Sequence, residues 1–183
     1  LDPLHAYGIE HPLWVTAWYV FCTVLGPTVF RLISLVVIVV ALTRRNVRVA
    51  MFLVVSVELS GLITEVAKTA ANRPRPVGAF VPAASSSFPS GHALGLTVSV
   101  LALLTLLLPV VHPPLRPWLI LVGAALVQAI GVGRVVLNVH HPSDVLAGWA
   151  LGYVWFVVCL LSVPPVAPVT AADETPAAPG SSR

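Results

Sequence analysis

Residues 93–111 read ALGLTVSVLALLTLLLPVV, an apolar stretch without a single charged side chain. A helix needs about 20 such residues, with a range of ~17–25, to cross a lipid bilayer. The stretch shows neither strict alternation nor an amphipathic stripe, and continuous apolarity favours a helix that faces lipid and other helices. Residues 93–111 therefore predict a membrane-crossing helix.

Four further apolar stretches predict four more spans. They run from Thr28 to Leu42, from Val49 to Ala70, from Trp118 to Val136 and from Val145 to Val163. The first is short unless it extends back through Pro27. Small residues such as Gly123 and Gly131 let neighbouring helices approach closely. We therefore expect an all-α fold, a polytopic membrane helix bundle with five spans in this chain.

The composition supports a bilayer as the solvent of this chain. Hydrophobic residues make up 57% and charged residues 9% of the 183 positions, whereas soluble domains carry roughly 25% charged residues. The net charge is +3, but the basic residues sit at the ends of apolar stretches or in one cluster, which argues against a nucleic-acid partner. Cys22 and Cys159 have no metal-ligand or disulfide spacing.

The chain divides into three parts. Residues 1–26 are expected to form an extracytoplasmic or interfacial segment, because aromatic rings such as Trp14 and Trp18 settle at headgroup depth. Residues 27–163 form the membrane domain. Residues 164–183 are rich in Pro, Ala, Ser and Thr and predict a disordered cytoplasmic tail.

The loops predict the orientation. Arg44, Arg45 and Arg48 fill the first tight connection and Arg116 follows the third span, so the positive-inside rule places both connections in the cytoplasm. The loops at 71–92 and 137–144, and the N-terminus, then face outward. An outward N-terminus without a preceding signal leads us to expect an upstream helix and six spans in the parent protein.

Three polar clusters fall on the predicted outer side. Polar residues are costly in a membrane protein, so their placement is informative. The clusters are KTAANRPRP at 68–76, PSGH at 89–92 and RVVLNVHHPSD at 134–144.

The clusters together predict a phosphate-binding site. Lys68, Arg75 and Arg134 supply three cations, and guanidinium groups match phosphate oxygens two at a time. Ser90 and Gly91 stand where a helix begins, and helix N-termini bind anions through free N–H groups. Glycine has no Cβ, so the backbone can approach a ligand closely.

Two histidines and one carboxylate supply reactivity. One of the imidazoles of His92 and His140 can attack phosphorus while the other protonates the departing oxygen. Asp144, four residues after His140, is placed to hold one imidazole nitrogen and fix the tautomer. No acidic cluster remains to hold Mg²⁺, so we expect neither metal nor cofactor.

The three clusters resemble the signature of the type-2 phosphatidic acid phosphatase superfamily, K-x6-R-P, P-S-G-H and S-R-x5-H-x3-D. All three parts occur here in order, and the resemblance spans roughly residues 10–163. One position departs from the pattern, because Gly133 stands where the family usually has Ser. This change removes a hydroxyl and puts one phosphate contact in doubt.

The resemblance implies a role for each matched residue and a six-helix membrane bundle. His140 is the implied nucleophile, Asp144 its orienting partner and His92 the general acid. The implied phosphate-binding residues are Lys68, Arg75, Ser90, Gly91 and Arg134.

Other polar residues have less definite interpretations. Glu58, Glu65 and Gln128 fall within predicted spans, where polar side chains need partners, and Glu65 is a candidate to position Lys68. His141 is off the family pattern, although one slip in register exchanges it with His140. Arg73 contacts either substrate or lipid headgroups.

The function that we expect is hydrolysis of a lipid phosphate or diphosphate through a phosphohistidine, in a bacterial plasma membrane, with the site facing outward. Polyprenyl diphosphates come first among the candidate substrates, before phosphatidylglycerol phosphate and phosphatidic acid. The alternatives are a non-catalytic lipid-binding or lipid-transport protein and, further off, an enzyme resembling vanadate-dependent haloperoxidases. The sequence leaves the oligomeric state open.

Overall fold

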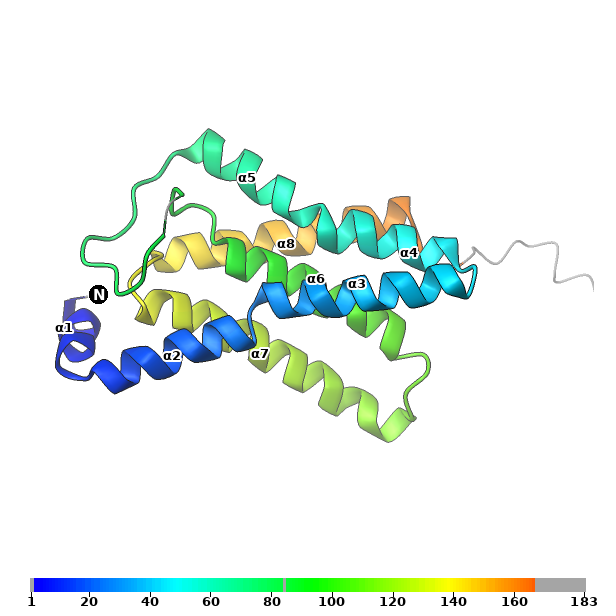
Figure 1. The fold of residues 1–183 in the computed structure, drawn as a ribbon, viewed down its shortest axis with the longest axis horizontal. Coiled ribbons are helices and arrows are strands. Elements are labelled where there is room, and N and C mark those ends of the chain that lie inside the picture. Colours follow the sequence, from blue (N-terminus) through cyan, green and yellow to red (C-terminus); the bar gives the residue numbers. More distant parts are fainter. Residues whose placement is uncertain (1, 84, 167–183) are drawn as a thin grey trace, which may run out of the picture.

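The computed structural model describes residues 2–83 and 85–166, and within these ranges every regular element is helical. The elements are α1 (Asp2–Glu10), α2 (Pro12–Val24), α3 (Pro27–Thr43), α4 (Val47–Leu53), the π-helix η1 (Val54–Glu58), α5 (Ser60–Ala71), α6 (Gly91–Leu107), the 3-10 turn η2 (Pro113–Leu115), α7 (Arg116–Val136) and α8 (Pro142–Ser162). Figure 1 shows the long helices side by side in an elongated bundle. The prediction of an all-α bundle is confirmed.

The helices account for all five predicted spans. The segments Pro12–Thr43, Val47–Ala71, Pro113–Val136 and Pro142–Ser162 are long and apolar enough to cross a membrane, and Gly91–Leu107 is a shorter apolar helix. Large apolar side chains face outward from the bundle, for example Val36, Val66 and Leu161, which are 65%, 69% and 78% exposed. Such a surface requires lipid, and the chain is a multi-pass membrane protein.

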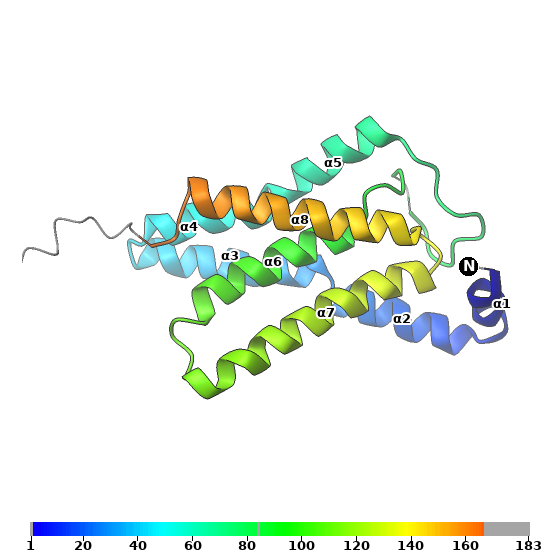
Figure 2. The same ribbon diagram turned by 180° about the vertical axis from the view of Figure 1, so that it is seen from behind.

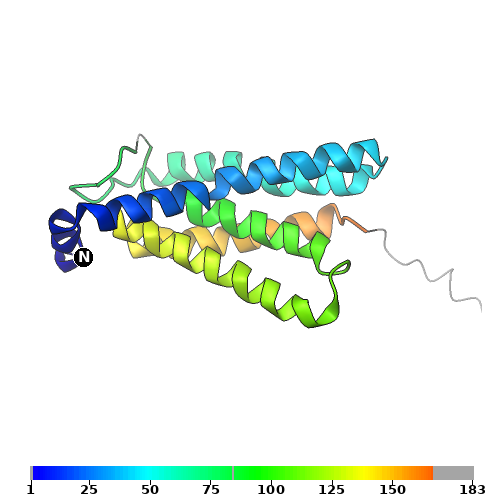
Figure 3. The ribbon, with the colours of Figure 1, turned by 60° about the horizontal axis from the view of Figure 1, so that its bottom comes forward.

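The first span is interrupted near its middle. Helix α2 ends at Val24 and α3 begins at Pro27, because proline has no N–H to donate and suits the first turn of a new helix. Figure 3 shows α2 and α3 following each other along the bundle. The interfacial position expected for residues 1–26 stays a prediction.

Helix α6 is the centre of the bundle and contacts α3, α5, α7 and α8, as Figure 2 shows from behind. Its closest approach is to α8, where two glycines face its backbone. A Cβ on Gly148 would lie 2.7 Å from the Ser90 carbonyl oxygen, and one on Gly152 would lie 2.8 Å from the Leu94 carbonyl oxygen. The two helices can therefore pack at this distance only without these side chains.

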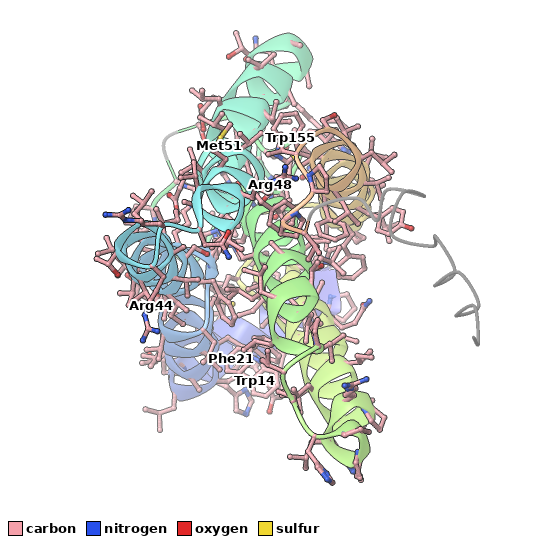
Figure 4. The ribbon with its side chains drawn as sticks, turned by 90° about the vertical axis from the view of Figure 1, so that its right-hand side faces the viewer. Trp14, Phe21, Arg44, Arg48, Met51 and Trp155 are labelled. Atoms are coloured by element: carbon pink, nitrogen blue, oxygen red, sulfur yellow. The ribbon has the colours of Figure 1, made fainter. Side chains whose placement is uncertain are left out.

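The π-helix separates α4 from α5. Its widened turn is closed by the Leu59 N–H, which donates to the Val54 carbonyl over 3.0 Å. The Trp155 indole N–H donates to the Ser56 carbonyl at 3.0 Å and so ties α8 to this turn (Figure 4). Beyond the π-helix, α5 diverges from α8 toward the end of the bundle that carries the 72–90 loop (Figure 1).

The arginines of the first tight connection lie at the end of the bundle away from the long loops. Arg44 and Arg48 lie at the α3–α4 connection, which faces the viewer in Figure 4. The loops at 72–90 and 137–141 lie at the opposite end (Figure 1). The tail predicted over residues 164–183 lies outside the described residues from 167 onward.

The α6–α8 contact leads to a first prediction. Gly152→Ala forces the added Cβ against backbone, so we expect a loss of about 1–3 kcal/mol in stability, seen as a lower melting temperature in detergent. The matched control is Gly123→Ala, whose Cβ would meet only the Val100 and Leu104 side chains, at 2.9 and 3.3 Å. Equal melting temperatures for the two variants would contradict the role given to the glycine contact.

Candidate active site

The three polar clusters meet at one end of the bundle around a cavity of about 340 Å³. Among the eight residues predicted for the site, six line this cavity: Lys68, Arg75, Gly91, His92, Arg134 and His140. Ser90 and Asp144 are fully buried beside it. The fold therefore brings together residues that are up to 76 positions apart, from Lys68 to Asp144.

His140 lies in the short loop between α7 and α8 and is 2% exposed. Its Nε2 is 3.5 Å from Arg75 Nη1, and its Nδ1 is 3.6 Å from Asp144 Oδ2. Burial and three neighbouring cations lower the pKa of His140 from 6.5 to about 2. The imidazole is therefore neutral at physiological pH, and a proton on Nδ1, beside the carboxylate, leaves the Nε2 lone pair at the cavity.

Asp144 is held from two sides. It is the third residue of α8, and its Oδ2 accepts the His141 backbone N–H at 2.8 Å, which satisfies a free donor at the helix start. Its Oδ1 accepts from Arg73 Nη1, also at 2.8 Å. Arg73 Nη1 also donates to Ser143 Oγ at 2.8 Å. The carboxylate is thus fixed in position and directed at His140.

Lys68 and Arg75 are held mostly by carbonyl oxygens. Lys68 Nζ donates to the Ser86 carbonyl at 2.5 Å and to Ser85 Oγ at 3.1 Å. Arg75 donates through Nε to the Ser85 carbonyl at 2.8 Å and through Nη1 to the Val139 carbonyl at 2.6 Å. Neutral acceptors fix both side chains without cancelling their charge. Within the described residues no ion pair joins Glu65 to Lys68, so the serines hold this lysine in place.

Arg134 projects from the last turn of α7 and is 8% exposed. Its Nε is buried without a hydrogen-bond partner among the described residues, which leaves a charged donor available at the cavity.

Gly133, the residue before Arg134, packs against α2. A Cβ at this position would lie 2.5 Å from Cys22 Sγ and 2.8 Å from Trp18 Cε3, so the space of a serine side chain is occupied.

The start of α6 completes the cavity wall. Ser90 caps the helix and accepts the Ala93 N–H at 3.4 Å, and its own N–H donates to the Asp144 carbonyl at 2.9 Å. A Cβ on Gly91 would lie 3.1 Å from Thr64 Cγ2, so glycine permits a close approach of α5. His92 follows in the first turn of α6, facing the cavity.

Sequence reasoning missed several contributors. It left the role of Arg73 open, and the structure pairs this residue with Asp144. It gave no role to Ser85 and Ser86, although three successive serines, one residue before the PSGH segment, were a visible signal. It also passed over Arg31, which lines the same cavity from α3; a lone arginine within a predicted span was the available signal.

The fold and the site together define a class of protein: a polytopic membrane helix bundle with a cation-lined, histidine-bearing cavity at one end. Within that class the chain belongs to the PAP2 superfamily, whose family model matches residues 49–167. The match includes all three polar clusters and every residue predicted for the site.

Relatives of known activity resemble parts of the chain. An undecaprenyl-diphosphatase of Sulfolobus acidocaldarius is 29% identical over 116 residues, which are 60% of this chain and 52% of that protein. A lipid A 1-phosphatase of Rhizobium etli is 35% identical over 118 residues, 57% of this chain and 46% of that protein. The chain thus spans about half the length of the curated relatives it matches.

A solved structure shares the fold. The crystal structure of a PAP2-type phosphatidylglycerolphosphate phosphatase from Bacillus subtilis superposes with a TM-score of 0.54 at 22% identity, over 85% of this chain and 88% of that one. At this identity the likeness concerns the arrangement of helices.

The packing around Gly133 leads to a second prediction. Gly133→Ser adds atoms against Cys22 and Trp18, so we expect a lower melting temperature, with a loss of about 1–3 kcal/mol. Adding Cys22→Ala removes the closest atom and is expected to restore part of the loss. Independent, additive effects of the two changes would mean that the predicted clash is absent.

Burial of neutral His140 leads to a third prediction. His140 binds a proton with the ordinary pKa of 6.5 in the unfolded chain and with a pKa of about 2 in the folded chain. The free energy of unfolding therefore falls as the pH drops below 6.5, by up to about 1.4 kcal/mol per pH unit. His140→Gln is therefore expected to flatten the decline in melting temperature between pH 7 and pH 5. His112→Gln, at an exposed histidine, is the control and keeps the wild-type slope; an unchanged slope in His140→Gln would refute the prediction.

Proposed function

We propose that the chain is an integral membrane lipid phosphatase that hydrolyses a lipid phosphate or diphosphate through a phosphohistidine on His140, without a metal. The observation on which this rests is the environment of His140. A neutral imidazole directs Nε2 at a cavity lined by Lys68, Arg75 and Arg134, with Asp144 3.6 Å from Nδ1.

The first step transfers the phosphoryl group to the protein. Nε2 of His140 attacks phosphorus, the bond from phosphorus to the leaving oxygen breaks, and His92 gives its proton to that oxygen. The three cations and the α6 N-terminus neutralise the charge on the phosphoryl oxygens, the task that a metal ion performs in many other phosphoryl-transfer sites. Asp144 stabilises the positive imidazole ring as it forms.

The second step regenerates the protein. Water attacks the phosphohistidine, His92 now accepts its proton, and the bond from Nε2 to phosphorus breaks. The products are inorganic phosphate and the free imidazole of His140. A dianionic phosphate among the cations favours a protonated His92 in the substrate complex, because it offsets the positive charge that otherwise repels the proton.

Polyprenyl diphosphates are the substrates that we favour, and an undecaprenyl-diphosphatase among the relatives supports this choice. We place the site on the extracytoplasmic face of a bacterial plasma membrane. The support for this side is that Arg44 and Arg48 lie at the other end of the bundle (Figure 4), where the positive-inside rule predicts the cytoplasm.

A fourth prediction tests the proposal directly. Purified protein in detergent with EDTA should release phosphate from a panel of polyprenyl diphosphate, phosphatidylglycerol phosphate and phosphatidic acid, and His140→Ala should lose at least about 10³-fold of this turnover because the nucleophile is gone. Labelled substrate should leave acid-labile, alkali-stable label on the wild type alone.

The control for this experiment is His141→Ala, which removes a neighbouring imidazole but keeps the backbone N–H that holds Asp144. It is expected to retain turnover. Loss of activity in EDTA that added Mg²⁺ restores would refute metal independence. A folded wild type that binds but never hydrolyses these lipids would favour a lipid-binding or transport protein.

A further inference from the structure

The cavity continues past the catalytic residues to Arg31, a cation on α3. Its wall on α5 is formed by Gly61, Thr64, Glu65 and Lys68, which recur at helical spacing and share one face. Lys68 lies at the catalytic end of this face. Gly61 lies at the deep end, where a Cβ would be 2.7 Å from Arg31 Nη2; glycine therefore leaves room for the guanidinium group.

Two contacts place Arg31 relative to the anion-binding start of α6. Gly91 lies close to Thr64, because a Cβ added to Gly91 would be 3.1 Å from Thr64 Cγ2. The Arg31 guanidinium lies against Gly61. Thr64 and Gly61 are three residues apart, about 4.5 Å along the helix axis. Arg31 is therefore about one helical turn deeper than the helix terminus that faces the scissile phosphate.

The deep end of the cavity is also the side of the leaving group. His92, the proposed acid, lies beside Gly26, the residue before α3. A Cβ added to Gly26 would be 3.6 Å from His92 Cδ2. Pro27 and Arg31 then line the cavity from the first turns of α3, one helical turn apart on the same face. A group attached to the leaving oxygen consequently extends from His92 toward Arg31.

Arg31 has hydrogen-bonding capacity that the protein does not use. Its Nη2 donates to Ser60 Oγ at 3.2 Å, but its Nε is buried without a partner among the described residues, as is Glu58 Oε1. In the described part of the chain no ion pair forms between Arg31 and any carboxylate. An arginine within a membrane span is costly, and one that faces a cavity calls for a ligand.

We propose that Arg31 binds the second phosphoryl group of a lipid diphosphate, so that this residue sets the preference for diphosphates over monophosphates. The inference rests on the proposed function. The two phosphoryl groups of a diphosphate share one bridging oxygen, so a terminal phosphate at His140 places the other within reach of a cation one helical turn deeper. The planar guanidinium group suits a pair of phosphoryl oxygens.

The test compares farnesyl diphosphate with farnesyl monophosphate, which share a tail. In Arg31→Gln we expect the ratio of kcat/KM for the diphosphate to that for the monophosphate to fall roughly tenfold or more, the effect of losing a charged hydrogen bond. Arg31→Lys keeps the charge and should restore part of the ratio. Arg44→Gln, which removes an exposed arginine at the opposite end, is the control and keeps the wild-type ratio. An unchanged ratio in Arg31→Gln overturns the proposal.

Two further measurements keep the test decisive. If Arg31→Gln does not fold, Gly61→Ala displaces the guanidinium group without removing it and should lower the same ratio; an unchanged ratio there overturns the proposal. If the wild type hydrolyses neither farnesyl lipid nor any lipid of the panel named above, the proposed function fails, and inorganic pyrophosphate and orthophosphate serve as binding probes by thermal shift in a His140→Ala background. Arg31→Gln should then weaken pyrophosphate binding roughly tenfold more than orthophosphate binding; equal weakening overturns the assignment of Arg31.

Discussion

The contact between the first turns of α6 and α8 holds the site together. The Ser90 N–H donates to the Asp144 carbonyl at 2.9 Å, and Gly148 lies so close to the Ser90 carbonyl that a Cβ would be 2.7 Å away. Because both contacts involve backbone, the two helix starts are fixed relative to each other regardless of side-chain rotamers. The positions of the proposed acid, His92 on α6, and of the carboxylate, Asp144 on α8, are therefore also fixed relative to each other.

Charge is the second constraint on the site. Lys68 and Arg75 converge on one cavity and repel each other, and their main hydrogen-bond acceptors are the carbonyl oxygens of Ser85, Ser86 and Val139. Carboxylates in these places would neutralise the cations. The buried carboxylate, Asp144, is instead paired with Arg73, and neither residue is among those that line the cavity. Among the described residues that line the cavity, the carboxylate Glu65 is outnumbered by four cations, Arg31, Lys68, Arg75 and Arg134. The cavity therefore keeps a positive potential that an anionic headgroup can neutralise.

The sequence predicted the five apolar spans, because a run of apolar residues is a local signal that needs no knowledge of contacts. It did not predict the helices α1 and α2 in residues 1–26. It also predicted which residues would meet, through the resemblance to a family signature whose three parts each have a fixed internal spacing. It could not predict the pairing of Arg73 with Asp144, which joins residues 71 positions apart. Nor could it predict the π-helix at Val54–Glu58, since no glycine or proline marks that turn and tertiary contacts such as that of Trp155 stabilise it.

The π-helix explains how a polar cavity can extend into an apolar bundle. A purely α-helical continuation from α4 would keep α5 on the course set by α4, whereas one widened turn changes the helix register and direction. After this turn α5 diverges from α8 (Figure 1), and its face from Gly61 to Lys68 lines the cavity. Glu58 ends the π-helix. Two residues later, Ser60 Oγ accepts a hydrogen bond from Arg31. The π-helix therefore opens the cavity and also places polar groups at its deep end. An unbroken apolar helix would leave no room for the cavity and no hydrogen-bond partner for Arg31.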